Sequence, residues 1–330
     1  MNWVERILSG FPNKRALVAG DVCLDRWCRY DPACSDLSRE TGIARTAVVS
    51  TQITPGAGGT IANNLAALGA GAVAVLGVIG ADGNGHELRQ ALESRGISHA
   101  LSVTHPDVAT FTYTKLINVQ TGEEDLPRLD FINNKPLPAA AEKLVVDRLR
   151  NAVSSYDVIL VSDQAETGAG GVITPAVRAE LASLAILYPH KVYWVDSRMR
   201  LEHFRGMILK PNEQEARAAS ERCSGSPDFR RLRELTASPL LVITHGPKGA
   251  LLVAPEGETW VPAVPVENPA DICGAGDSFS AGAAVAYAIT RDAVAAARFG
   301  NLVASVTIMK KGTGTASPEE VRAVASRPAS

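Results

Sequence analysis

The chain has 330 residues, of which 46% are hydrophobic and 21% are charged, and this composition is typical of a globular protein with a large core. Its formal net charge of -2 at pH 7 excludes broad binding to nucleic acid or to an acidic membrane, because both need clustered positive charge. Five cysteines without a C-x-x-C pair, and no apolar run of signal-peptide or membrane-spanning length, favour a cytoplasmic protein without a disulfide framework, zinc site or membrane segment.

The first core strand is predicted at residues 16–20, an apolar run of buried-strand length. Two carboxylates, Asp21 and Asp25, follow it closely. Ligands collect at the carboxyl edge of open parallel sheets, so either carboxylate could bind the hydroxyls of a sugar. Loop capping by Asp21 and a surface position for Asp25 explain the same pattern equally well.

Residues 26–40 are polar and are expected to be irregular. Three other segments alternate polar and apolar residues or are rich in β-branched and aromatic residues, as half-solvated strands are. We expect them to pair as a small antiparallel lid outside the main sheet: residues 46–53, 108–118 and 128–131. A glycine-dense turn at 55–59 precedes a predicted helix at 60–68, and it indicates either close approach of a ligand or a flexible loop.

The rest of the chain alternates buried strands with helices, which predicts a mostly parallel sheet covered on both faces. Strands are expected at 72–79, 158–162, 192–196, 207–210 and 240–244, and a hairpin at 250–254 and 259–261. Helices are expected at 83–95, 139–151, 172–187, 277–289 and 293–310, with a further helix opening at 211–215 and a frayed carboxyl end. The fold class is therefore a three-layer α/β/α sandwich with a small antiparallel lid, in one domain over 1–330 with lid segments near 26–54 and 106–132.

The turn at residues 271–282 carries the strongest chemical signal. Gly274 and Gly276 can bring bare backbone N–H groups against a ligand, and the helix that follows adds unpaired donors and a positive dipole end. Such a place favours phosphate. Asp277 would repel a phosphate unless it accepts the proton of an attacking hydroxyl, although a carboxylate at a helix start is also a common N-cap.

With these pieces placed, the sequence resembles the ribokinase (pfkB) family of small-molecule kinases over nearly its whole length, and most strongly the branch that phosphorylates D-glycero-β-D-manno-heptose 7-phosphate. Four stretches carry the resemblance: residues 20–26, 55–70, 271–277 and 300–318. Lesser matches are Lys115, residues 128–131 and the Leu-Lys-Pro-Asn-Glu-Gln-Glu run at 209–215.

The resemblance implies a kinase that uses ATP and Mg²⁺ and takes a small sugar as its substrate. It implies that Asp277 is the catalytic base and that Gly274, Ala275 and Gly276 form the anion hole around the transferring phosphoryl group. The sugar-binding residues would be Asp21, Asp25, Gly56, Thr60, Lys115 and Arg128. The nucleotide-binding residues would be Asn212, Thr244, Gly246, Gly249 and Asn301, with Glu215 holding Mg²⁺ through water. The lid could pair with a second copy of the chain in a homodimer.

Two positions depart from the heptose branch and keep alternatives open. Thr60 stands where an asparagine is expected, and Glu166 stands where that branch usually has lysine, a charge reversal that removes a partner for a substrate phosphate. A kinase of another sugar or sugar derivative, or a sugar- or nucleotide-binding sensor on the same scaffold, fits these changes. A dinucleotide-dependent oxidoreductase is less favoured because no G-x-G-x-x-G follows the first strand. The 330 residues do not include the nucleotidyltransferase domain that some heptose enzymes carry, so if the chain serves that pathway, we expect it to carry out only the kinase step.

Overall fold

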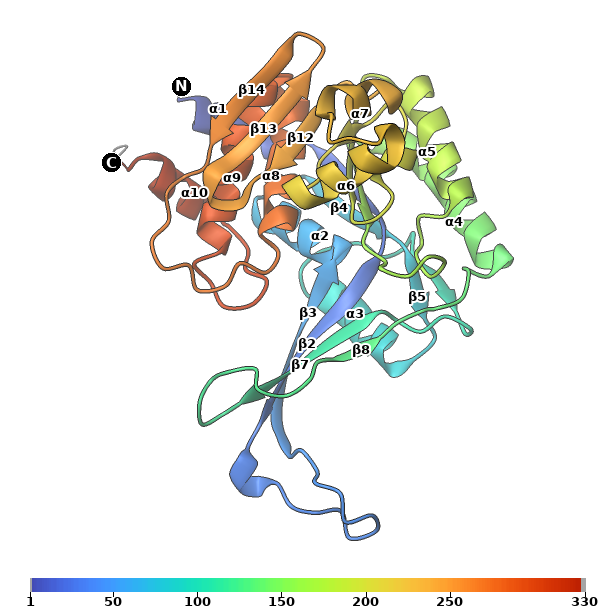
Figure 1. Cartoon of the computed structure of the whole chain (residues 1–330), viewed down its shortest axis with the longest axis vertical. Helices are drawn as coiled ribbons and strands as arrows, with labels where there is room; N and C mark the ends of the chain where they lie inside the picture. The colour runs from blue at the N-terminus through green and yellow to red at the C-terminus, as the bar shows by residue number, and fades with distance from the viewer. Residues whose placement is uncertain (1, 328–330) are drawn as a thin grey trace.

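A computed structural model describes residues 2–327 and contains a large sheet with eight strands, ordered β14-β13-β12-β11-β10-β9-β1-β4 (Figure 1). All pairs from β4 to β12 are parallel, and β13 and β14 add an antiparallel hairpin at one edge. The strands are β1 (Arg15–Gly20), β4 (Ala72–Leu76), β9 (Val158–Asp163), β10 (Val192–Ser197), β11 (Ile208–Leu209), β12 (Leu241–Thr244), β13 (Gly249–Ala254) and β14 (Gly257–Pro262).

Helices cover both faces of this sheet, because successive residues of its apolar strands point to opposite sides. Val18 and Leu160 belong to one core cluster, whereas their neighbours Leu17 and Ile159 belong to the other. The first face carries α1 (Trp3–Gly10), α2 (Gly58–Ala67), α8 (Ala275–Thr290), α9 (Ala293–Thr307) and α10 (Pro318–Ala325). The second carries α4 (Ala139–Ala152), α5 (Pro175–Leu187), α6 (Glu213–Ser224) and α7 (Phe229–Leu235). The predicted three-layer sandwich is confirmed.

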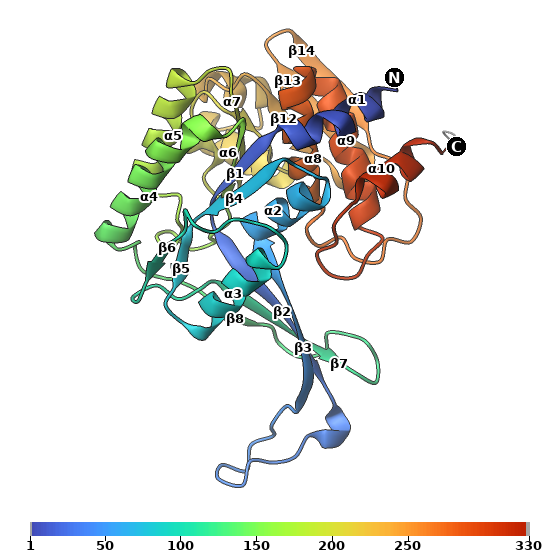
Figure 2. The same ribbon diagram turned by 180° about the vertical axis from the view of Figure 1, so that it is seen from behind.

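A second sheet, ordered β3-β2-β7-β8, projects from this body as the lid (Figures 1 and 2). Its strands are β2 (Val22–Tyr30), β3 (Val48–Ala57), β7 (Thr112–Asn118) and β8 (Leu129–Phe131), and α3 (Gly83–Glu93) packs against β2 and β3. The small lid is confirmed with two antiparallel pairs, β2–β3 and β7–β8. Its central pair, β2–β7, is parallel, and the expectation of an irregular segment from residue 26 was wrong because β2 continues to Tyr30.

Several element boundaries differ from expectation. The strand expected at 72–79 is broken at Gly77, where a Cβ would lie 2.7 Å from the Gly20 carbonyl oxygen; β5 (Val78–Gly80) then pairs with β6 (Val103–His105) instead of the main sheet. The helix expected from residue 172 starts at Pro175. Near the carboxyl end, Pro318–Ala325 form α10, closed at its start by a capping box of Ser317 and Glu320. The expectation of fraying was wrong for those residues, and its last part, 328–330, lies outside the described residues. Both β6 and α7 were missed.

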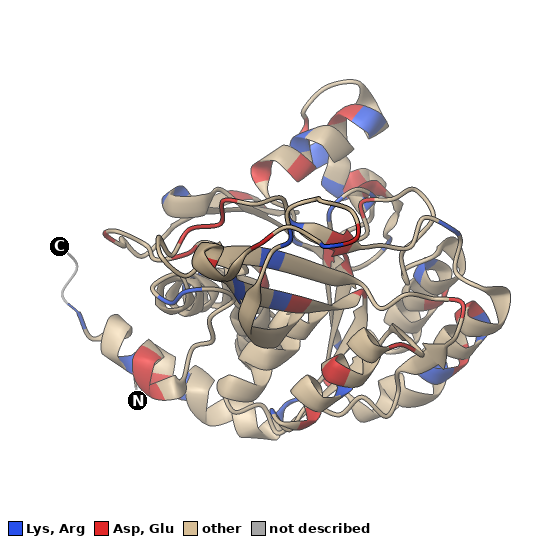
Figure 3. Ribbon diagram, turned by 90° about the horizontal axis from the view of Figure 1, so that it is seen from below, with Lys and Arg blue, Asp and Glu red and all other residues tan. Residues whose placement is uncertain are grey.

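Short 3₁₀ turns complete the description: Phe11–Asn13, Pro32–Cys34, Val153–Ser155, Leu201–His203 and Gly246–Lys248. Within residues 2–327, no helix is both long and apolar enough to cross a membrane. Acidic and basic positions are interspersed along the chain in the view from below (Figure 3).

Candidate active site

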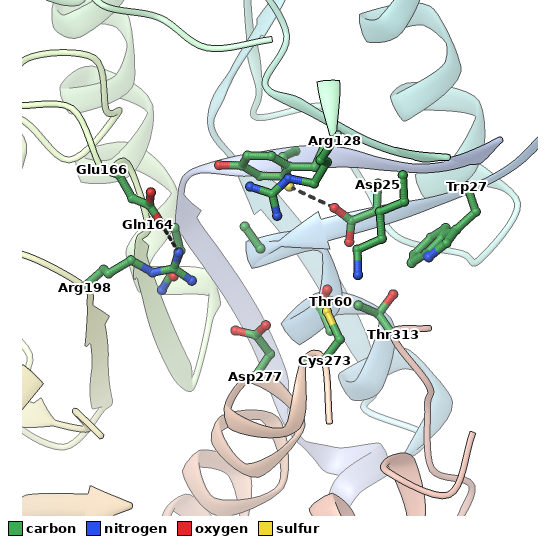
Figure 4. Close-up of a pocket in the computed structure, with 15 residues that line it drawn as sticks. Asp25, Trp27, Thr60, Arg128, Gln164, Glu166, Arg198, Cys273, Asp277 and Thr313 are labelled. Carbon is green, nitrogen blue, oxygen red and sulfur yellow. Dashed lines mark hydrogen bonds and ion pairs between the residues drawn. The ribbon is translucent and has the colours of Figure 1, made fainter. Parts of the chain in front are cut away.

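A pocket lies where the lid meets the carboxyl edge of the main sheet and the start of α8 (Figure 4). The lid and the segment leading into β8 contribute Cys23, Asp25, Trp27, Ala57, Tyr113, Lys115 and Arg128. The body contributes Thr60, Gln164, Glu166, Arg198, Cys273, Gly274, Asp277 and Thr313. Cys23, Asp25 and Trp27 are alternate residues of β2, so one face of that strand supplies all three. The structure therefore joins the predicted catalytic turn to several predicted sugar-binding residues.

The two glycines of the turn serve different purposes. Gly274 is left-handed, with φ 76°, and a Cβ there would lie 3.1 Å from the Thr60 methyl carbon. Gly276 lies within the first turn of α8, and a Cβ there would lie 3.2 Å from the Lys210 Nζ atom. Only Gly274 thus needs the backbone freedom that the sequence suggested; Gly276 leaves room for a lysine ammonium group.

The backbone donors of the turn are only partly available. The N–H of Ala275 donates to the carbonyl of Ile272 at 3.2 Å, so its predicted place in an anion hole is not supported by the structure. The N–H groups of Gly276 and Asp277 meet no backbone or side-chain acceptor among residues 2–327. These two donors sit at the positive end of a helix of 16 residues and remain suited to an anion.

Asp277 is not the N-cap of α8, although a carboxylate near a helix start often is. The N-cap is Gly274, and no side-chain capping bond is made there. Burial raises the pKa of Asp277 to about 8, the Asp196 carboxylate adds to that rise, and Lys210 and Arg198 oppose it. A raised pKa makes the ionised carboxylate a stronger base, so Asp277 at the floor of the pocket is suited to accept a proton once it is deprotonated.

Asp25 occupies the opposite wall, on β2. Burial raises its pKa to about 6, and the Cys23 thiol, Lys115 and Arg128 hold it lower than burial alone would. Gly56 does not line the pocket, but a Cβ there would lie 2.5 Å from the carboxylate atoms of Asp25. The glycine therefore makes room for the carboxylate instead of meeting a ligand.

The basic side chains of the pocket are already paired. Lys115 Nζ lies 3.4 Å from Glu124, and Arg128 makes two hydrogen bonds of 2.7 and 2.6 Å to Asp130 while lying over the Tyr113 ring. Glu166 forms an ion pair with Arg198, as Figure 4 shows. An acceptor phosphate would have to compete with a carboxylate at each of these groups.

Asp21 lies beneath the pocket and is 3% exposed. Its carboxylate accepts backbone N–H bonds from Gln164, Ala165 and Val172 at 2.8, 2.9 and 2.8 Å. The assignment of Asp21 to sugar binding is corrected, because these bonds occupy its oxygens. Asp21 instead holds the segment that brings Gln164 and Glu166 to the pocket.

The predicted nucleotide residues lie outside this pocket. Asn212 follows β11 and bridges to Thr244 at the end of β12, and both line a neighbouring depression. Gly246 and Gly249 have φ of 56° and 117°, and Gly249 approaches the Val261 carbonyl too closely for a Cβ. Asn301, on α9, donates to the Pro262 carbonyl at 2.9 Å and lines a separate groove beside residues 262–267.

Glu215 offers one carboxylate for a metal ion. It forms a capping box with Asn212, in which one carboxylate oxygen accepts the Asn212 N–H at 2.8 Å. No group of three or more His, Cys, Asp or Glu side chains suited to a metal occurs in residues 2–327. This donor set does not form a protein cage, but it fits Mg²⁺, which commonly uses one or two carboxylates together with water and substrate phosphates.

Sequence reasoning missed Arg198 and Lys210. Each follows the end of a parallel strand by one residue, β10 and β11 respectively, and that position was the available signal. Trp27, Tyr113 and Gln164 were also missed; Trp27 and Tyr113 lie on lid strands whose pocket-facing side could not be assigned without their pairing.

Three kinds of known protein match the chain. The model of the family described as "pfkB family carbohydrate kinase" matches residues 25–320 of the chain. The bifunctional protein HldE of Trichlorobacter lovleyi is 31% identical over 336 residues, covering 98% of this chain and 65% of that protein; HldE of Geobacter metallireducens is 31% identical, covering 96% and 64%. The chain thus spans just under two thirds of these relatives. A ribokinase crystal structure from Thermotoga maritima superposes with a TM-score of 0.70 at 19% identity, covering 95% of this chain and 100% of that one.

Proposed function

Because the chain belongs to the pfkB family of carbohydrate kinases, we propose that it transfers the γ-phosphoryl group of ATP to the anomeric hydroxyl of D-glycero-β-D-manno-heptose 7-phosphate. The observation that carries the proposal is the position of Asp277, which lines the same pocket as Asp25 and lies in the first turn of α8. A proton acceptor and a hydroxyl-binding carboxylate thus lie on opposite walls of one cavity.

The residues divide the reaction between them. Asp25 orients the sugar, and Asp277 accepts the proton of the attacking hydroxyl. The acceptor oxygen forms a bond to the γ-phosphorus, and the bond from that phosphorus to the leaving ADP oxygen breaks. The free N–H groups of Gly276 and Asp277 stabilise charge on the phosphoryl oxygens. Mg²⁺, held by Glu215 through water and by the phosphates, would neutralise charge on the nucleotide.

The nucleotide is proposed to run from this turn along the ends of β11 and β12. Thr244, Gly246 and Gly249 lie there, and the groove beside Asn301 and residues 262–267 would take the base. Equilibrium dialysis with ATP and Mg²⁺ tests this path. Substituting Asn301 with leucine should weaken ATP binding without changing the affinity for sugar.

The heptose assignment is supported by identity of 31% to two HldE proteins. A second candidate, a kinase of another sugar or sugar derivative, is favoured by the Glu166–Arg198 ion pair, which neutralises a cation that a substrate phosphate could use. ADP release should be measured with heptose 7-phosphate, the unphosphorylated heptose, ribose, fructose and fructose 6-phosphate. A much larger kcat/KM for any acceptor other than the heptose phosphate would overturn the heptose assignment and favour the second candidate.

We also propose that the lid pairs with the lid of a second copy of the chain. Strands β8 and β3 are the two edges of their sheet, and Leu129 and Phe131 on β8 are exposed, as are Val48 and Val49 on β3. An apolar sheet edge is a template for pairing. Sedimentation velocity should give a dimer that becomes a monomer on Phe131→Lys; a wild-type monomer at micromolar concentration would refute the pairing.

A further inference from the structure

Lys210 is a charged residue in a buried place. It follows β11 by one residue and is 4% exposed. Its Nζ atom lies 2.5 Å from an oxygen of Asp196, at the end of β10, and Asp196 is itself buried. Lysine is almost never fully buried unless it is paired, and a buried pair does not in itself stabilise a fold. The position of Lys210 therefore calls for an explanation beyond stability.

The ammonium group of Lys210 lies against the catalytic turn. A Cβ built on Gly276 would be 3.2 Å from the Lys210 Nζ atom, and no other heavy atom would lie within 4 Å of it, chain neighbours and the backbone of the same helix turn aside. The cation therefore lies in tight contact with the place that a side chain at Gly276 would take, at the first turn of α8.

Three carboxylates surround the ammonium group of Lys210. The groups that face it are the carboxylates of Asp196 on β10, Glu215 on α6 and Asp277 on α8. Arg198, just after β10, and Asp25, on β2, act on Asp277 from farther out. Burial lowers the pKa of Lys210, but the three carboxylates outweigh burial and hold it above its ordinary value. The residue therefore remains an ammonium ion at the start of α8.

We propose that Lys210 is a further residue of the phosphoryl-binding site, whose ammonium group contacts oxygens of the transferring phosphoryl group beside the N–H groups of Gly276 and Asp277. The inference rests on the kinase activity but not on the identity of the sugar. Lys210 keeps its proton throughout: the hydroxyl proton goes to Asp277, the acceptor oxygen bonds to phosphorus, and ADP leaves with the electron pair. Asp196 holds the ammonium in place, and the cation balances charge on the phosphoryl oxygens.

Two variants test the proposal. Lys210→Met removes the cation, and Lys210→Met combined with Asp196→Asn removes both charges of the ion pair, so that Asp196 is not left as a buried charge without its partner. The matched control is Lys143→Met, on α4, where an exposed lysine forms a pair of the same 2.5 Å length with Asp147. Circular dichroism and thermal unfolding establish that each variant is folded.

The first measurement is the binding of ADP and Mg²⁺ with and without aluminium fluoride, by calorimetry in the absence of sugar. Aluminium fluoride mimics the transferring phosphoryl group. We expect the folded double variant to bind ADP about as tightly as the wild type does. Aluminium fluoride should increase the affinity of the double variant for ADP about 100-fold less than it increases that of the wild type. An unchanged gain in the double variant, or no gain in the wild type, would overturn the proposal.

The second measurement is turnover with whichever sugar the wild type phosphorylates, so a failed heptose assignment does not affect it. We expect kcat to fall about 100-fold in the double variant and to be unchanged in Lys143→Met. In Lys210→Met, the rising limb of kcat/KM should move to higher pH, because Asp277 loses a neighbouring cation that lowers its pKa. A folded double variant that keeps kcat within about twofold of the wild type would contradict a role in phosphoryl binding.

Discussion

The two walls of the pocket are built in different ways. The wall at α8 consists of a backbone turn at Gly274 and the carboxyl group of Asp277, which a long helix holds in place. The lid wall consists of side chains, Asp25, Lys115 and Arg128, on a sheet that projects from the body. The first wall depends on few side chains and fits phosphoryl transfer in general. The second can change its preference by single substitutions, and it is where the substrate would be chosen.

The largest effect is expected at the α8 wall. Asp277→Asn should lower kcat by about 10²–10⁴-fold, because an amide cannot accept the hydroxyl proton, while ATP still binds. Steady-state ADP release and equilibrium dialysis measure the two quantities. Asp228→Asn, at the start of α7, is the control, since its side chain caps a helix and asparagine can do the same. Turnover within tenfold of the wild type would remove Asp277 from the role of base.

A smaller loss is expected on the lid wall from a residue that touches no ligand. Gly56→Ala should lower kcat/KM by about 10²-fold, since the new methyl group would displace the Asp25 carboxylate from 2.5 Å away and misplace the sugar. The effect should appear mainly in the KM for sugar. Gly83→Ala, where a Cβ meets nothing within 4 Å, is the matched control. Equal kinetics for both variants would mean that Asp25 does not orient the acceptor.

The raised pKa of Asp277 also predicts a cost to stability. The folded chain holds the proton up to about pH 8, whereas the unfolded chain releases it near 3.8, so wild-type stability should fall as the pH rises between these values. Asp277→Asn removes that dependence. Its advantage in unfolding free energy should grow from near zero at pH 4 to about 2 kcal/mol at pH 9, a value kept small because the residue retains contact with solvent. Urea unfolding at several pH values measures it; a constant difference would contradict the raised pKa.

The smallest effect is expected at the exposed Glu166–Arg198 pair. Glu166→Gln frees Arg198 and should raise kcat/KM for phosphorylated acceptors over unphosphorylated ones by about fivefold, since exposed ion pairs contribute roughly 0–1 kcal/mol. The ratio of the two kcat/KM values is the measurement. Glu142→Gln, on α4, controls for the change in net charge. A ratio that falls would show that Glu166 itself binds the phosphorylated acceptor's hydroxyls.

The sequence predicted the α8 wall better than the lid wall, for physical reasons. A turn of small residues running into a helix is a local pattern, so Gly274 and Asp277 could be found without knowing the fold. Strand β2 was missed because Arg26 and Arg29 interrupt its apolar pattern, and a strand of a solvated sheet does not need a continuous apolar run.

Residues that depend on tertiary contacts could be interpreted only in part. A carboxylate after a strand can bind a ligand or backbone amides, and only the position of residues 164–172 shows that Asp21 does the second. The role inferred for Lys210 depends on its contact with Gly276, which is 66 positions away in the numbering. No local pattern carries that pairing.

The connections between the lid and the body are very short. Only Asp21 separates the end of β1 from the start of β2, and β3 runs directly into α2. Side chains alternate between the two faces of a sheet along a strand. The number of residues counted from Gly20 therefore decides which side chains of β2 face the pocket. One residue inserted at Asp21 would turn Cys23, Asp25 and Trp27 to the opposite face together, whereas an insertion at the distant loop of 31–47 would leave their orientation unchanged. The lid wall is thus intolerant to a change in chain length at its root.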